Sequence, residues 1–169
     1  MDNLFAMDVQ RAAIQAMETV YIIATSRNID TIRGRYDFLL TVVPTLKSAK
    51  HHPQYSTLIQ KALEQFKAMR PASVPQDYQL AIIQNPDTFD ITEFYCGSLI
   101  NAMKRFCEKQ SKEIKGLKKE TAKTKRISKV MDTIKVTRSE LETKCISTTS
   151  YPTALNEIEK LATTFSRNV

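Results

Sequence analysis

The chain has 169 residues, 42% of them hydrophobic and 25% charged, which suits a folded protein with a buried core and argues against wholesale disorder. It has only three Gly and six Pro, which are the usual residues of tight hairpins, so long helices are favoured over a sheet. The formal net charge is +7, but residues 104–140 hold thirteen basic and five acidic residues, so the excess lies in that segment and the charge of the whole chain does not indicate nucleic-acid binding.

Three amphipathic helices are predicted in the first 69 residues, over 4–25, 30–49 and 54–69. The first has apolar residues at steps of three and four, which places them on one helix face: Phe5, Val9, Ala13, Ala16, Val20 and Ile23. Pro44 lies inside the second helix, and we expect a kink rather than an end because the apolar pattern resumes at Leu46. The short connection before the third helix predicts that the second and third pack as an antiparallel pair.

The middle of the chain leads into its longest helical pattern. Residues 70–77 and 85–90 are predicted to be loops, and the apolar stretch 78–84 a short helix. Asp90 and Glu93 have the spacing of a capping box, which marks a helix start. A helix running unbroken from 91 to 135 would be about 65 Å long, against about 30–40 Å for a compact domain of this size. The helix therefore either projects from the bundle or folds back near Gly116.

Thr137 and Glu140 have the spacing of a second capping box, so a separate helix is expected from residue 138. Residues 146–150 are a break, and Pro152 suits the first turn of a last helix over 152–166. Together these patterns predict an all-α protein, an antiparallel helical bundle with one long basic helix or helical hairpin projecting from it. We expect residues 1–169 to form a single helical domain, with residues 104–136 as its basic arm.

Sequence patterns of enzymes and cofactor sites are not found. There is no glycine-rich phosphate loop, no HExxH and no ExxH pair, and the two histidines are adjacent in a turn before Pro53. Cys96, Cys107 and Cys145 are odd in number and lack CxxC spacing, which indicates free thiols rather than a disulfide framework or a zinc site. A cysteine nucleophile using His51 as its base is less favoured than a buried helical cysteine. We expect no catalytic residue, no metal and no cofactor.

The apolar segments of the chain are too short for a signal peptide or a membrane span, so we expect a cytoplasmic protein without membrane contact. The first residues, MDNLFAMDVQRAA, lack the long apolar region of a signal peptide. The most apolar run, VYIIA at 20–24, is far shorter than the about 20 residues that span a bilayer. The basic segment also lacks a bulky apolar stripe for lying on a membrane surface.

The basic segment is dense, with eight Lys or Arg and two acids in residues 112–129. On one continuous helix, at about 100° per residue, eight basic side chains would form a ridge within about 160°: Arg105, Lys109, Lys112, Lys115, Lys119, Lys123, Arg126 and Lys129. Such a ridge could follow a phosphate backbone with a strong salt dependence. No aromatic residue between 107 and 130 could stack on bases, so sequence readout is not expected.

The function favoured by these patterns is a non-catalytic helical module for protein interaction or assembly. Its partner would be another protein or a second copy of this chain, and binding of nucleic acid through the ridge is the alternative. An apolar seam at Ile127, Met131 and Ile134 could join two copies, although the polar residues between this seam and Leu99–Phe106 make a continuous coiled coil poor. A solvated arm that is rich in Lys is the simplest interpretation of the same segment.

Overall fold

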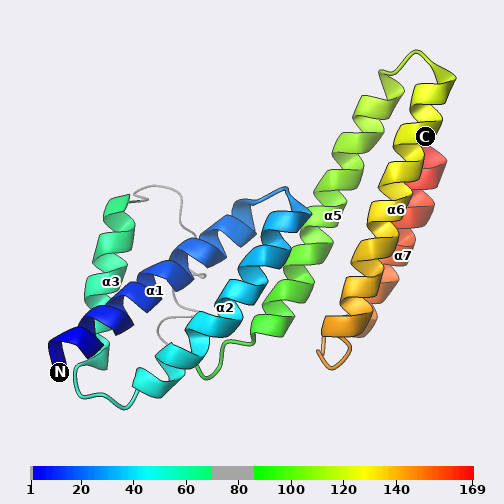
Figure 1. Ribbon diagram of the computed structural model, residues 1–169. Helices are drawn as coiled ribbons and strands as arrows, with labels where there is room; N and C mark the ends of the chain where they lie inside the picture. Colours follow the sequence, from blue (N-terminus) through cyan, green and yellow to red (C-terminus); the bar gives the residue numbers. More distant parts are fainter. Residues whose placement is uncertain (1, 70–85) are drawn as a thin grey trace. The chain divides into compact units, whose positions relative to one another are not determined.

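The computed structural model describes residues 2–69 and 86–169, with side chains from residue 8 onward in these ranges (Figure 1). Within them the chain forms six helices that pack against one another and no strand, so the prediction of an all-α helical bundle is confirmed. The predicted loop 70–77 and helix 78–84 lie outside the described residues. Among the helices that are described, none combines the length and the apolar character needed to cross a membrane.

The chain divides into two compact units. One comprises residues 1–26 and 30–91, and the other comprises residues 27–29 and 92–169. The expectation of one domain over residues 1–169 stays a prediction, since a compact unit in a structure is not a measurement of independent folding.

The first unit contains α1 (Asp2–Thr25), α2 (Ile29–Ala49) and α3 (Tyr55–Met69), close to the predicted ranges. The apolar stripe of α1 is buried at every position with a described side chain: Val9, Ala13, Ala16, Val20 and Ile23. Helix α2 continues through Pro44, as expected. Pro44 cannot donate to the carbonyl of Leu40, and both residues lie on the exposed face, where water can solvate that carbonyl.

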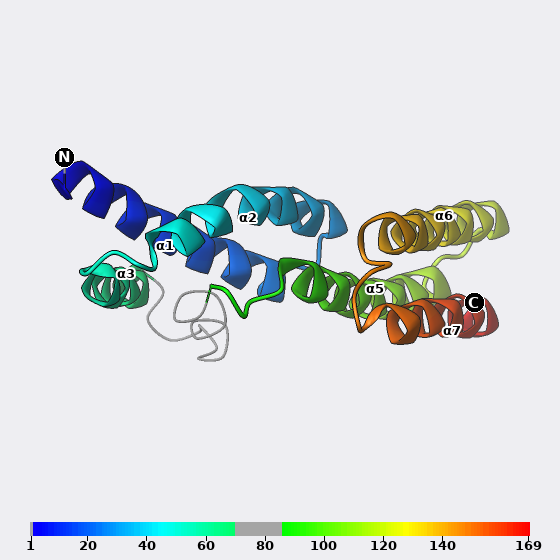
Figure 2. The same ribbon diagram turned by 90° about the horizontal axis from the view of Figure 1, so that it is seen from below.

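The packing of α3 differs from the prediction. Among the described helices, α3 makes its closest backbone approach to α1 and not to α2 (Figures 1 and 2). The physical reason is that α3 has a buried stripe, including Leu58, Ala62 and Phe66, and a short connection fixes only where a helix begins, not which neighbour covers its stripe.

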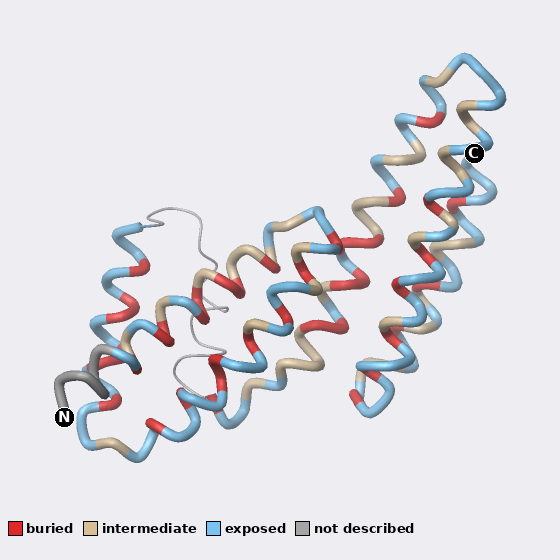
Figure 3. Tube along the Cα trace, in the orientation of Figure 1, coloured by how far each residue is buried: buried red, intermediate tan, exposed pale blue. Residues whose placement is uncertain are grey.

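The second unit contains α5 (Ile91–Lys115), α6 (Glu120–Lys144) and α7 (Tyr151–Asn168), which form an up-down-up three-helix bundle (Figures 1 and 2). Each helix has buried residues along one side and exposed residues along the other (Figure 3). Large side chains with under 2% exposure in this unit include Tyr95, Leu99, Met103, Ile114 and Phe165.

The long helical pattern folds back after Lys115, so the hairpin alternative is the correct one. The last turn of α5 tightens through hydrogen bonds from Gly116 N to Glu113 O (3.2 Å) and from Leu117 N to Ile114 O (3.0 Å). Gly116 has no positive φ, and a Cβ added there would meet Glu113 O at 3.4 Å, an ordinary contact. The turn therefore uses the low helix propensity of glycine and not its access to left-handed backbone.

The separate helix predicted from residue 138 is wrong, because α6 runs unbroken from 120 to 144. Thr137 does not cap a helix start. It is fully buried, and its hydroxyl donates to the Thr133 carbonyl one turn earlier (2.9 Å). A threonine can satisfy its hydroxyl in this way inside a helix, so its spacing to Glu140 does not by itself mark a start.

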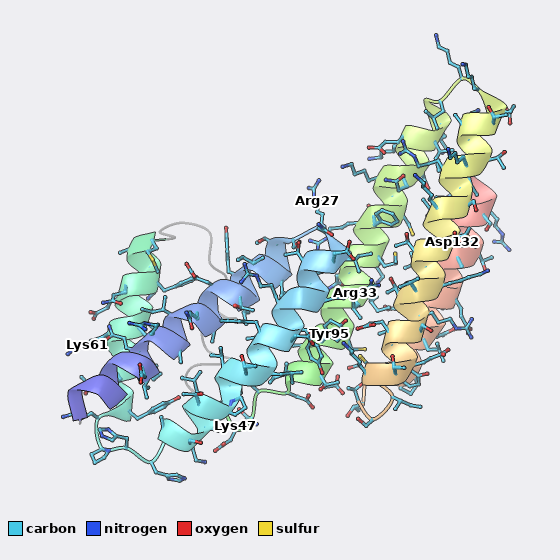
Figure 4. All side chains as sticks on the ribbon, viewed as in Figure 1. Arg27, Arg33, Lys47, Lys61, Tyr95 and Asp132 are labelled. Atoms are coloured by element: carbon cyan, nitrogen blue, oxygen red, sulfur yellow. The ribbon has the colours of Figure 1, made fainter. Side chains whose placement is uncertain are left out.

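Polar contacts join the three helices at the end of the unit where α5 begins. The carboxylate of Glu93 accepts hydrogen bonds from the backbone N–H of Ser150 (3.1 Å) and from its hydroxyl, so an α5 residue satisfies the start of α7. The phenol of Tyr95 on α5, labelled in Figure 4, donates to Glu140 Oε1 on α6 (2.7 Å). Lys144 pairs with Glu140 (3.0 Å) and lies 6.0 Å from the centroid of the Tyr95 ring.

Two neighbouring positions on α6 test which face of this helix supports the fold. Ile134 is 4% exposed and Val136 is 50% exposed. Ile134→Ala should lower the free energy of unfolding by about 2–5 kcal/mol, because it leaves a cavity in the bundle. Val136→Ala should change it by less than about 0.5 kcal/mol. Urea unfolding followed by circular dichroism measures both, and equal effects would contradict the orientation of α6.

Acid stability tests the contact between Glu93 and Ser150. Hydrogen bonds from the Ser150 hydroxyl and N–H lower the pKa of Glu93 below its ordinary 4.5, against a smaller opposing effect of burial. Because the folded-state pKa is the lower one, this stabilisation is present above about pH 4.5 and is lost as the pH falls through the folded-state pKa. Glu93→Gln should therefore flatten the loss of stability between about pH 5 and pH 3.

Ser150→Ala is the matched variant, since it removes the strongest donor and leaves the carboxylate in place. It should flatten the same acid limb in part. A Ser150→Ala protein with the wild-type pH dependence would show that this contact does not set the pKa of Glu93.

Candidate binding surface

The positive charge of the chain gathers at one end of the second unit. We call residues 109–129 the basic hairpin end; they comprise the last turns of α5, the connection 116–119 and the first half of α6. This segment contains nine basic and two acidic residues. Buried Ile114 on α5 and Val130 on α6 (each 1% exposed) and half-buried Leu117 fasten the basic hairpin end to the bundle.

Arg126 links the two helices of the basic hairpin end. Its Nη1 donates to Glu113 Oε2 (2.9 Å) and to Gln110 Oε1 (3.1 Å), both on α5. The side chains of Arg126 and Glu113 are 39% and 43% exposed, so water and salt screen this Arg126 bridge. The bridge connects α5 to α6 and pairs one of the basic residues with one of the two acids.

Seven lysines of the basic hairpin end lie exposed to solvent: Lys109, Lys112, Lys115, Lys118, Lys119, Lys125 and Lys129. Among the described residues, no Asp or Glu lies within ion-pair distance of any of them. The other acid, Glu120, lies 3.9 Å from Lys123 and is 88% exposed. The resulting field is strongly positive within a Debye length, about 8 Å at physiological salt.

The eight residues of the predicted ridge do not form a single line on one helix, because α5 ends at Lys115. Four lie on α5 (Arg105, Lys109, Lys112 and Lys115), Lys119 lies in the connection, and three lie on α6 (Lys123, Arg126 and Lys129). Arg105 is half-buried and lies on α5 about one helical turn before Lys109. Arg126 forms the Arg126 bridge to Glu113. The structure brings the remaining six together at the hairpin end. Their role in binding stays a prediction.

Lys118 and Lys125 belong to the same surface and were not part of the predicted ridge. A helical wheel carried through Gly116 places them on another face. A wheel restarted after Gly116 would have included them, and the low helix propensity of this residue was the available signal.

A shallow depression runs along the exposed side of α6 beside these lysines. It is lined by Glu120, Thr121, Thr124, Lys125, Ser128 and Lys129, and it is open to solvent. Its hydroxyl groups can donate and accept hydrogen bonds, while its lysines only donate. The depression suits contact with an extended, hydrogen-bonding partner better than enclosure of a small molecule.

Helix α6, which carries the predicted oligomer seam, packs against α7. Ile127 and Met131 are half-buried, and Ser166 Oγ of α7 lies 3.9 Å from Met131 Sδ. Ile134 is 4% exposed within a single chain. The side chain of Ile134 is thus covered by its own unit. The role of the seam between two copies of the chain stays a prediction.

The groups able to do chemistry are few in the described part of the chain. No cluster of three or more His, Cys, Asp or Glu is placed there to hold a metal. His52 Nδ1 accepts a hydrogen bond from the Gln54 backbone N–H (3.1 Å), which stabilises its turn. Burial, with a smaller effect of Glu108, raises the pKa of the Cys107 thiol to about 11, so it is protonated at neutral pH.

The fold and this surface define an all-α protein with a basic hairpin end. Comparison with protein-family models, with curated proteins and with solved structures found no match for this chain.

A double-mutant cycle on Arg126→Gln and Glu113→Gln measures the Arg126 bridge. Because both side chains are partly exposed, we expect a coupling free energy of about 0.2–1 kcal/mol in low salt that declines as salt is added. Urea unfolding of the four proteins at two salt concentrations provides the values. A coupling of zero in low salt would contradict the bridge.

Proposed function

We propose that this chain is a non-catalytic helical interaction module that binds an acidic surface of another protein through its basic hairpin end. The observation that carries this proposal is the set of seven exposed lysines, none of them within ion-pair distance of a described acid, at the end of two helices that the Arg126 bridge links. A cluster of positively charged side chains speeds the encounter with a negatively charged partner and disfavours partners of like charge.

An acidic protein partner is favoured over nucleic acid by the details of the surface. Glu120 remains 88% exposed among the lysines, where it would repel a continuous phosphate backbone. The hydroxyl-lined depression offers contacts that a protein side chain or main chain can use. Nucleic acid is the second candidate, supported by the density of lysines, which would contact phosphates without reading bases.

Self-association has weaker support. Two copies meeting at their basic hairpin ends would bring like charges together. The alternative seam would have to expose Ile134, which is buried within the chain.

Charge reversal separates these candidates. The variant Lys115→Glu/Lys119→Glu/Lys125→Glu changes three exposed lysines of the basic hairpin end. The variant Lys47→Glu/Lys61→Glu/Lys67→Glu makes the same change in net charge on exposed positions of the first unit, where Figure 4 labels Lys47 and Lys61. Circular dichroism serves as the control that both variants are as helical as the wild type.

Fluorescence anisotropy then measures binding to a polyglutamate peptide and to a duplex oligonucleotide of similar charge. The hairpin variant should bind polyglutamate at least about 10-fold more weakly at low salt, with a shallower salt dependence, because each lysine contributes a separate ionic contact. The control variant should bind nearly as the wild type does. Equal loss in both variants would contradict a localised site, and tight binding of the duplex alone would favour the second candidate.

Sedimentation of the wild type without a ligand tests the third possibility. A mass above monomer that rises with concentration would favour self-association over a foreign partner.

A further inference from the structure

Two of the three cysteines lie where α5 begins and α6 ends. Cys96 is in the second turn of α5, and Cys145 is the residue that ends α6, with its N–H donating to the Leu141 carbonyl (2.9 Å). Both are free thiols with no exposed surface. They are almost 50 residues apart in the sequence, and nothing in their spacing marks them as a pair.

Contacts on both sides of these cysteines hold the two segments together. Tyr95, next to Cys96, donates to Glu140 (2.7 Å), and its ring lies 6.0 Å from the ammonium group of Lys144, next to Cys145. Glu93, one turn before Cys96, accepts from the Ser150 N–H (3.1 Å) beyond Cys145. The two cysteines therefore lie in segments that are held together, and the hydrogen bond between their thiols shows that these two side chains are neighbours.

The two thiols are hydrogen-bonded to each other, and this hydrogen bond shifts their pKa values in opposite directions. The hydrogen bond from Cys145 lowers the pKa of Cys96, against an opposing effect of burial. The same hydrogen bond, together with burial, raises the pKa of Cys145. Cys96 is thus the thiol that ionises first, and Cys145 is the adjacent thiol that can resolve an oxidised Cys96.

We propose that Cys96 and Cys145 form an oxidation site, at which a hydroperoxide converts the buried thiol pair into an intramolecular disulfide between the start of α5 and the end of α6. The Cys96 thiolate attacks one peroxide oxygen, the O–O bond breaks, and Cys96 becomes a sulfenic acid while hydroxide leaves. The Cys145 sulfur then attacks the Cys96 sulfur, the S–O bond breaks, and water leaves. Overall, two thiols lose two electrons and two protons, and one hydroperoxide is reduced.

The surroundings of Cys145 suit such a closure. The chain leaves the helix at this residue, so its backbone can shift more easily than a position in the middle of a helix. The turn 146–150 follows Cys145 directly; in it Thr148 donates to the Cys145 carbonyl (2.6 Å) and hydrogen-bonds with Cys96, and Ile146 is 65% exposed. Because both thiols are buried, the reaction waits for local opening of this turn.

Cys107 is the internal control. It lies on the same helix, about 16 Å along the axis from Cys96 at about 1.5 Å per residue. It is also buried, at 5% exposure. A disulfide requires Cα atoms within about 7 Å, so Cys107 cannot pair with Cys96 in the folded chain.

The test uses the full chain treated with hydrogen peroxide at neutral pH, quenched, unfolded and alkylated without a reductant, then digested and mapped by mass spectrometry. The expected result is a peptide pair joined through Cys96 and Cys145 that is two hydrogens lighter than the sum of its parts, with Cys107 alkylated. Dithiothreitol should restore all three thiols. A Cys107→Ser protein should form the same joined pair, and Cys96→Ser or Cys145→Ser should not.

The wild-type map decides the question alone if the two variants at the buried pair fail to fold. Recovery of Cys96 and Cys145 as alkylated thiols or as separate sulfinic acids, while the protein has consumed peroxide, would overturn the proposal. So would a joined pair that involves Cys107. As a second measurement, the oxidised protein should melt at a higher temperature than the reduced one, because the new bond closes a loop of about 50 residues in the unfolded chain.

Discussion

The reversal of the chain at residues 116–119 is the constraint on which the second unit depends. By ending α5 at Lys115, it returns α6 along α5 and allows Ile114 on α5 and Val130 on α6 to be buried. A straight helix would have kept its lysines further apart but would have left these apolar side chains in water. Burying a side chain of this size gains about 1.5–3 kcal/mol, whereas each repulsion between exposed lysines costs a few tenths of a kcal/mol. Apolar burial therefore outweighs the repulsion that the reversal creates.

Polar contacts in this unit differ between its two ends. Where α5 begins, Tyr95, Glu140 and Lys144 interact, and Glu93 meets Ser150, so all three helices are joined. At the basic hairpin end the polar contacts between α5 and α6 include those of Arg126 with Glu113 and Gln110, and the surrounding lysines are exposed to solvent. One end is thus held mainly by contacts within the chain, and the other presents charge that a partner could neutralise. This contrast is the structural basis of the proposed binding function.

Apolar residues of α6 that were predicted to face a second chain lie in or beside the core of their own unit. Ile134 occupies the core of its own unit, and Met131 lies beside Ser166 of α7. Part of the apolar repeat that was predicted as a seam for a second chain is thus covered within its own unit, and its role between two chains stays a prediction. An intramolecular neighbour has the advantage that no translational entropy is lost in bringing it into place. On the basic hairpin end, in contrast, Glu113 and Glu120 pair only with Arg126 and Lys123 among the described residues, and the seven exposed lysines have no acid within ion-pair distance.

The sequence by itself determined the helical class and most helix positions, because periodicity of 3.6 residues is a local property that each segment carries alone. It located the continuation through Pro44, the start near residue 91 and the last helix with Pro152 in its first turn. It could not choose between a projecting helix and a hairpin, since the local repeat of apolar residues is the same in both. It also misassigned Thr137, whose hydroxyl had a local alternative to capping. Only the tertiary structure decided that α3 packs on α1, which lysines share a surface, and that Cys96 lies beside Cys145. These are relations between residues far apart in the chain, and they depend on how buried faces match in space rather than on any local repeat.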